Sequence, residues 1–116
     1  MAHATFQKPV ISTLDAIGNT PLVKLSKIVA PNSADVYVKL EYYNPTGSYK
    51  DRMALAMVEE AEKRGTLRPG ITVLEFTGGS TGSSLAFVCA VKGYPIKIVS
   101  SDPRPVSRRS NTRSRC

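Results

Sequence analysis

With 116 residues, of which 41% are hydrophobic and 22% charged, the chain is long enough for one modest domain and too short for two. It contains no run near the roughly 18 apolar residues of a membrane span. Its N-terminus lacks the charged start and apolar run of a secretion signal, so we expect a soluble, cytoplasmic protein without a membrane. The net charge of +7 comes largely from five arginines in residues 104–116, and the nearly balanced remainder argues against nucleic acid as the partner.

The predicted elements alternate between strands and helices along the chain. Stretches rich in β-branched and aromatic residues indicate strands, and apolar residues at helical spacing indicate helices that Gly65 and Gly93 end. In chain order these are a short strand at 21–25, a strand at 34–40, a helix at 48–64, a strand at 71–76, a helix at 83–92 and a strand at 96–99. This order predicts an α/β fold, a parallel sheet with flanking helices in a three-layer βαβαβ arrangement.

The first predicted helix carries one apolar stripe. Met53, Met57 and Ala61 recur every four residues, with Ala54 and Val58 one step round the helix. We expect this stripe to face the core.

The composition changes at Asp102-Pro103 to Pro, Arg, Ser, Asn and Thr, which cannot bury a core. We therefore predict one domain at residues 1–103 and a disordered tail at 104–116.

Cys89 lies in an apolar run and Cys116 ends the chain, so a buried thiol and an exposed free thiol are expected instead of a disulfide. His3 stands alone, which gives a metal site no support.

Two turns at the carboxyl ends of predicted strands are candidates for a site. In the run at 44–52, Lys50 stands where a helix begins, and a lysine attacks a carbonyl carbon only when it is deprotonated. Arg52 and the positive helix N-terminus would lower the lysine pKa. On spacing alone, a solvated lysine at a helix start is the other interpretation.

The second turn, Thr77-Gly78-Gly79-Ser80-Thr81-Gly82, also joins a strand to a helix. Backbone N–H groups at a helix N-terminus bind a carboxylate or phosphate, and the glycines let a ligand approach. A plain capped connection is the alternative. The spacing lacks the glycine fingerprint of a dinucleotide site and the ending of a phosphate-binding loop.

Three ordered motifs carry a resemblance to a known family. They are the run Ile-Gly-Asn-Thr-Pro-Leu-Val at 17–23, the run at 39–52 that contains Lys50, and the turn at 77–82. Through them, residues 11–101 resemble the cysteine synthase family (O-acetylserine sulfhydrylase, with cystathionine β-synthase as a relative). These are fold-type II, tryptophan synthase β-like enzymes that use pyridoxal 5'-phosphate.

The resemblance implies a role for each turn. Lys50 matches the lysine that binds pyridoxal phosphate covalently and then removes the α-proton of the substrate. In the family, O-acetylserine loses acetate and sulfide adds to give L-cysteine, and the enzymes are commonly homodimers. Thr77, Gly78, Gly79 and Thr81 match the loop that binds the substrate carboxylate.

The sequence departs from the family in two places. Ser80 stands where an asparagine commonly meets the ring hydroxyl of the cofactor, so the substrate preference is open. The run Gly78-Gly79-Ser80 also leaves a serine or threonine dehydratase-like lyase as an alternative activity. The family's phosphate-holding loop and the serine that meets the pyridine nitrogen have no counterpart here. We therefore expect a truncated or frameshifted enzyme. Its activity stays open, with a non-catalytic fragment carrying a nucleic-acid-binding arginine tail as a second alternative.

Overall fold

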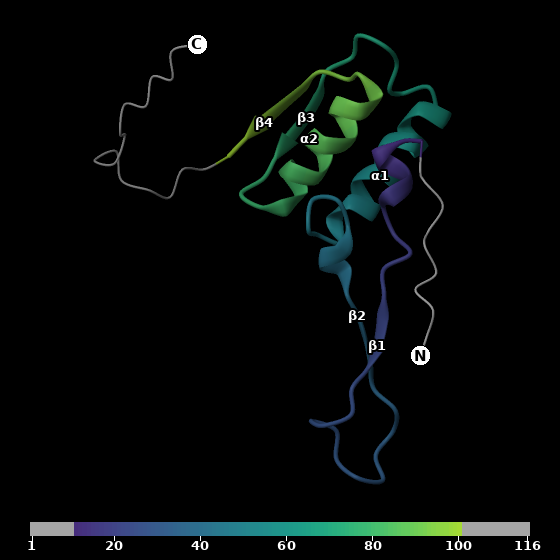
Figure 1. Ribbon diagram of the computed structural model, residues 1–116. Coiled ribbons are helices and arrows are strands. Elements are labelled where there is room, and N and C mark those ends of the chain that lie inside the picture. Colours follow the sequence, from purple (N-terminus) through teal and green to yellow (C-terminus); the bar gives the residue numbers. More distant parts are fainter. Residues whose placement is uncertain (1–10, 101–116) are drawn as a thin grey trace, which may run out of the picture.

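The computed structural model describes residues 11–100, so the predicted tail at 104–116 and Cys116 lie outside the described residues. In chain order the elements are η1 (Thr13–Ala16), β1 (Leu22–Lys24), β2 (Tyr37–Lys39), η2 (Glu41–Tyr43), α1 (Lys50–Lys63), β3 (Val73–Phe76), α2 (Ser80–Lys92) and β4 (Ile96–Val99). Figure 1 shows a body built from α1, α2, β3 and β4, and an arm formed by β1 and β2.

The β3–α2–β4 segment is a parallel crossover unit, as predicted. β3 and β4 pair in parallel from Val73 opposite Ile96 to Phe76 opposite Val99. α2 ends where Gly93 adopts a left-handed conformation with φ of 79°, which glycine reaches without a Cβ clash. This unit therefore places the turn that follows β3 directly at the start of α2.

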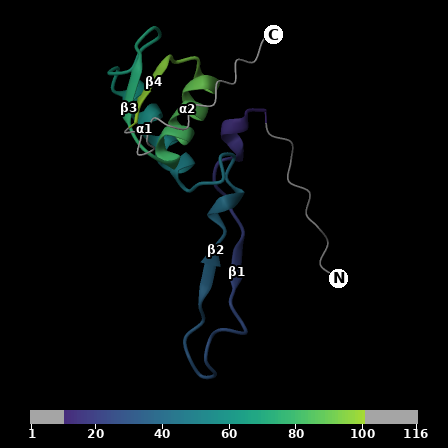
Figure 2. The same cartoon turned by 90° about the vertical axis from the view of Figure 1, so that its left-hand side faces the viewer.

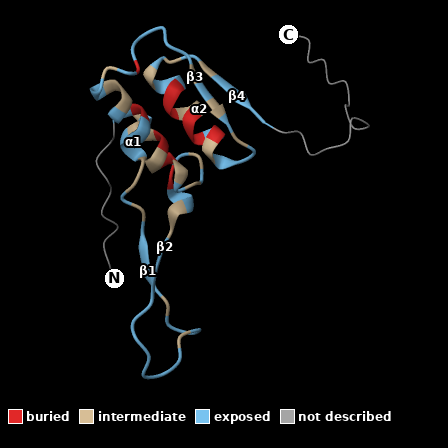
Figure 3. Cartoon of the chain, turned by 180° about the vertical axis from the view of Figure 1, so that it is seen from behind, coloured by how far each residue is buried: buried red, intermediate tan, exposed pale blue. Residues whose placement is uncertain are grey.

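The hydrophobic core lies between the two helices. Ala54 and Val58 of α1 are buried with Leu85, Val88 and Cys89 of α2, which confirms the buried thiol at Cys89. Figure 3 shows the buried residues along α2 and on the neighbouring part of α1. The predicted stripe on α1 is correct for Ala54 and Val58 and wrong for Met57, whose exposed fraction is 52%. The buried line continues instead to Asp51, one turn before Ala54.

The predicted strand at 34–40 forms, but not in the parallel sheet. β2 pairs with β1 in antiparallel register, with Val23 opposite Val38, and the side chains of both strands are exposed. Outside the ladder, the Leu40 N–H donates to the Pro21 carbonyl at 2.9 Å and the Leu25 N–H donates to the Val36 carbonyl at 2.9 Å. The backbone of β2 and its flanking residues thus hydrogen-bonds to β1 and the residues beside it. β2 therefore belongs to the arm that projects from the body in Figure 2.

The fold is α/β, as predicted, but it contains two separate two-stranded sheets among the described residues. α2 contacts both strands of the parallel sheet and also packs against α1. The three-layer sandwich predicted from the order of elements is not seen in residues 11–100. In this range, no helix has the length and apolar character required to cross a membrane.

Candidate active site

The turn that carries Lys50 is held by local hydrogen bonds. Gly47 has a φ of 77°, and its N–H donates to the Asn44 carbonyl at 2.7 Å. The Ser48 hydroxyl accepts from the Lys50 N–H at 3.1 Å, which satisfies one free donor at the start of α1. Lys50 Nζ lies 4.4 Å from the centre of the Tyr49 ring. The ion pairs within residues 11–100 use other basic side chains, so this amine has no carboxylate partner there.

A polar cluster behind this turn is built around Glu41. Arg52 donates to both Glu41 oxygens, from Nε at 2.9 Å and from Nη2 at 3.1 Å. The Thr20 hydroxyl donates to Glu41 Oε1 at 2.7 Å. The Arg52 guanidinium, followed by the Thr20 hydroxyl, holds the pKa of Glu41 far below its usual range. Glu41 in turn raises the pKa of Arg52.

The structure shows which groups Arg52 contacts. Its guanidinium forms an ion pair with the Glu41 carboxylate, with Nε 2.9 Å from Oε2. Arg52 also anchors the segment before β1, because its Nη2 donates to Thr20 at 3.2 Å. Gly18 has a φ of 92°, where a residue with a Cβ would be strained, and that Cβ would lie 2.8 Å from Arg52 Nη1.

The glycine-rich turn leads from β3 into α2. The Thr77 hydroxyl accepts from the Gly79 N–H at 3.2 Å, and Gly79 stands at the helix N-cap, where no side chain caps the helix. Gly78, Gly79 and Ser80 are exposed, and Thr81 is half-buried. A Cβ at Gly82 would overlap the Thr77 side chain, which explains a glycine inside the first turn of α2. An exposed helix start without a side-chain cap suits an anion.

One buried carboxylate brings the two turns together. Asp51 follows Lys50 and has no exposed surface. Ser84, in the second turn of α2, donates to Asp51 Oδ1 at 2.6 Å. At the other ends of the helices, Lys92 of α2 donates to Glu62 of α1 at 2.8 Å, so the two helices run side by side in the same direction. The N-termini of α1 and α2 therefore lie at the same end of the body.

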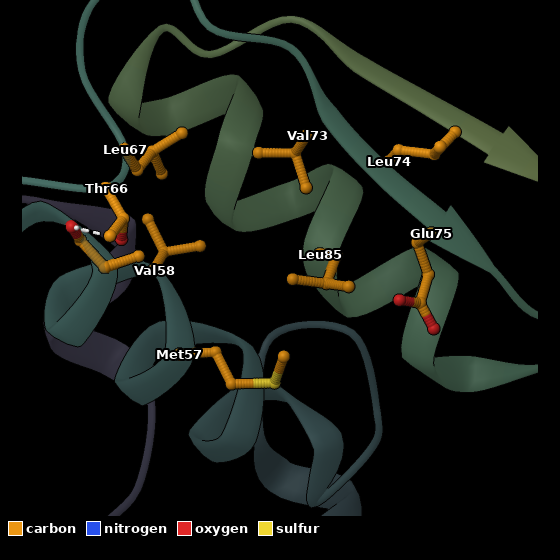
Figure 4. Close-up of a pocket in the computed structure, with 9 residues that line it drawn as sticks. Met57, Val58, Thr66, Leu67, Val73, Leu74, Glu75 and Leu85 are labelled. Atoms are coloured by element: carbon orange, nitrogen blue, oxygen red, sulfur yellow. Dashed lines mark hydrogen bonds between the residues drawn. The ribbon is translucent and has the colours of Figure 1, made fainter.

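A separate apolar pocket of about 260 Å³ opens between α1, α2 and β3, as Figure 4 shows. It is lined by Met57, Val58, Ala61, Thr66, Leu67, Val73, Leu74, Glu75 and Leu85. None of the predicted site residues contributes to this lining, and the pocket lies alongside the middle of α1, away from Lys50. Its mostly apolar walls offer little to a phosphorylated or zwitterionic ligand.

Sequence reasoning identified both turns but missed the residues that join them. Asp51 lies in the motif with Lys50 and received no role, because spacing alone does not show that it is buried. Ser84 offered a weak signal, as a hydroxyl at the start of an apolar helical run. The Glu41 cluster depends on contacts between residues 11 to 32 positions apart, which a local pattern cannot reveal. Within residues 11–100, no group of His, Cys, Asp and Glu could hold a metal ion.

Residues 13–114 match the family described as pyridoxal-phosphate dependent enzyme, and the chain belongs to that family. The chain is 57% identical over 102 residues to a cysteine synthase of Staphylococcus aureus, a match that covers 88% of this chain and 32% of the relative. The chain thus spans about a third of the length of the curated relatives it matches.

Solved structures show the same relation. A cysteine synthase from Entamoeba histolytica superimposes with a TM-score of 0.82 at 35% identity, covering 93% of this chain and 33% of that protein. A hydrogen sulfide-producing enzyme from Fusobacterium nucleatum gives a TM-score of 0.78 at 46% identity, covering 90% and 34%. The small sheets and paired helices are therefore part of the fold-type II architecture, as the sequence motifs implied.

Proposed function

We propose that this chain carries the lysine-bearing part of a cysteine synthase that uses pyridoxal 5'-phosphate and converts O-acetylserine and sulfide into L-cysteine. The observation that supports this most strongly is the placement of Lys50. Its amine has no carboxylate partner within residues 11–100. Lys50 stands at the start of α1, and the next residue, Asp51, joins α1 to α2, the helix that follows the glycine-rich turn. A cytoplasmic location and a homodimer for the complete enzyme belong to the same proposal.

The residues of the two turns fit this cofactor and substrate. Lys50 supplies the amine, and the spaces beside the α-carbons of Gly78 and Gly79 are open, with no atom within 4 Å of a Cβ built on either. When bound, pyridoxal phosphate supplies an electron-withdrawing ring that stabilises negative charge at the α-carbon of the substrate.

Each side chain then has a defined task. Lys50 would hold the cofactor, and its Nζ would accept the α-proton of the substrate. Thr77, Gly78, Gly79 and Thr81 bind the substrate carboxylate through N–H and hydroxyl donors. Ser80 is exposed at the first position of α2, where its hydroxyl would donate to the ring oxygen of the cofactor.

A product assay tests this proposal and its alternative. The full chain is incubated with pyridoxal phosphate and either O-acetylserine with sulfide or serine or threonine alone. L-cysteine from the first mixture supports the synthase, and Lys50→Ala should abolish it, whereas Lys63→Ala, an exposed lysine on α1, should not. A 2-oxo acid from serine or threonine would favour the lyase, which the run Gly78-Gly79-Ser80 leaves open. If neither product forms, both assignments fail for the isolated chain.

A further inference from the structure

The carboxylate of Asp51 has no exposed surface, and neither does the side chain of its partner Ser84. Its Oδ2 accepts from the Thr46 N–H at 2.8 Å. Its Oδ1 accepts from the hydroxyls of Thr46 and Ser84, whose oxygens lie 3.2 Å apart. Thr46 belongs to the loop before α1 and Ser84 to α2, so one side chain connects three segments.

The partners of this carboxylate explain why it connects these segments so firmly. A buried carboxylate without hydrogen bonds would cost several kcal/mol. Among residues 11–100, Asp51 forms no ion pair, and it is satisfied by one N–H, two hydroxyls and the positive N-terminus of α1. The Ser84 hydroxyl is the donor that α2 contributes to this carboxylate. The first turn of α1 therefore depends on α2 for its position.

We propose that Asp51 is a positioning residue that fixes Lys50 relative to the glycine-rich turn through Thr46 and Ser84. This inference rests on the proposed function, in which the lysine and the anion-binding turn must act on one ligand. Lys50 and Asp51 are adjacent at the start of α1, and Ser84 lies four residues after Ser80 on α2. A displacement of about 1 Å between such groups can cost about 100-fold in rate.

The test uses matched pairs of variants in the full chain. Ser84→Ala and Thr46→Val each remove one hydroxyl from the carboxylate. Ser83→Ala changes the exposed serine next to Ser84, and Thr46→Ser keeps the hydroxyl. Far-UV circular dichroism checks that every variant is folded. Two quantities are then measured: amide hydrogen exchange by NMR, and the pyridoxal phosphate concentration that half-saturates the Lys50-dependent absorbance.

We expect Ser84→Ala and Thr46→Val to speed exchange of the backbone N–H of residue 46 about tenfold, since the carboxylate that accepts from this N–H loses one of its two hydroxyl donors. Exchange at Val58 and Val88, in the middle of the helices, should stay unchanged. The half-saturating concentration should rise about fivefold or more in the same two variants, while Ser83→Ala and Thr46→Ser match the wild type.

Three results would count against parts of this account. Unchanged exchange at Thr46 in Ser84→Ala overturns the coupling of the two turns. Faster exchange at every amide would show that the carboxylate has only a structural role. Faster exchange at residue 46 with an unchanged half-saturating concentration of pyridoxal phosphate would show the same, and either result overturns the positioning role. Absence of any Lys50-dependent absorbance in the wild type defeats the proposed function, and the exchange data alone then decide whether Asp51 joins the turns.

Discussion

At the residue scale, Glu41 holds together the segments behind the lysine turn. Its oxygens accept from Arg52, Thr20 and the Asn44 amide, and Asn44 Oδ1 accepts from the Gly18 N–H at 2.9 Å. The cluster thus ties the chain before β1 to the start of α1. It requires a charged Glu41, because an ionised carboxylate only accepts hydrogen bonds and a protonated one must donate.

The lowered pKa of Glu41 predicts how stability depends on pH. In the unfolded chain, Glu41 titrates near the usual value of about 4.3. Its stabilising contribution is complete above that pH and is lost as the pH falls towards the lower folded pKa. Glu41→Gln should therefore lower the urea midpoint at pH 7, and its difference from the wild type should shrink between about pH 4.5 and pH 3.

The control for this prediction is Glu60→Gln. Glu60 forms an exposed pair with Arg64 at 2.7 Å, and such pairs are worth about 0–1 kcal/mol, so its urea midpoint at pH 7 should stay near the wild type. A gap between Glu41→Gln and the wild type that stays constant down to pH 3 would show that the charge of Glu41 does not stabilise the fold.

At the element scale, α2 carries the core, because it contacts α1 and both strands of the parallel sheet. Leu85 is only 3% exposed and packs in the cluster with Val58 and Val88. Truncating a buried leucine removes apolar contacts and leaves a cavity, at a cost of about 2–5 kcal/mol. That is a large share of the stability of a small domain.

We therefore predict that Leu85→Ala lowers the free energy of unfolding by about 2–5 kcal/mol or prevents folding. Leu74→Ala, at a β3 position that is 68% exposed, should stay within about 0.5 kcal/mol of the wild type. Urea unfolding followed by circular dichroism compares the two variants. Equal effects at both positions would mean that the core is not between α1 and α2.

The same scale shows what the sequence could predict. Helical spacing and the glycines at 65 and 93 gave the two helices to within a few residues, and short connections gave the β3–α2–β4 unit. The pairing of β2 was wrong, because β-propensity marks a strand without naming its partner. The residue pattern marked Lys50 and the glycine-rich turn as candidates, and the resemblance supplied the role predicted for each. The contacts of Asp51 and Glu41 needed the structure, because side-chain partners far apart in sequence leave no local pattern.

At the scale of the whole molecule, large apolar side chains remain on the surface. Leu74 and Phe76 on β3 are 68% and 72% exposed, and the parallel sheet has only two strands among the described residues. β3 and β4 pair along one edge each, so each strand has a second edge that the other strand does not cover. Exposed apolar surface next to unpaired strand edges promotes association between chains.

We predict that the 116-residue chain self-associates as its concentration rises. The double variant Leu74→Lys with Phe76→Lys should reduce this association, because charge on an edge strand opposes pairing. Ile28→Lys adds charge at an apolar position outside the sheet that is 82% exposed, so it should have little effect. Sedimentation velocity over a range of concentrations measures the change. A monomer at all concentrations would contradict the prediction.

The central claim is that Lys50 is the amine that binds pyridoxal phosphate, and covalent trapping tests it most directly. The full chain is titrated with pyridoxal phosphate, the visible absorbance is followed, and the adduct is reduced with borohydride and located by peptide mass mapping. The other seven lysines react weakly at most, so Lys50→Ala is measured alongside. We predict a saturable band that is absent in Lys50→Ala and a label at Lys50. An unsaturated signal of equal size in both proteins, with label spread over many lysines, would contradict the claim.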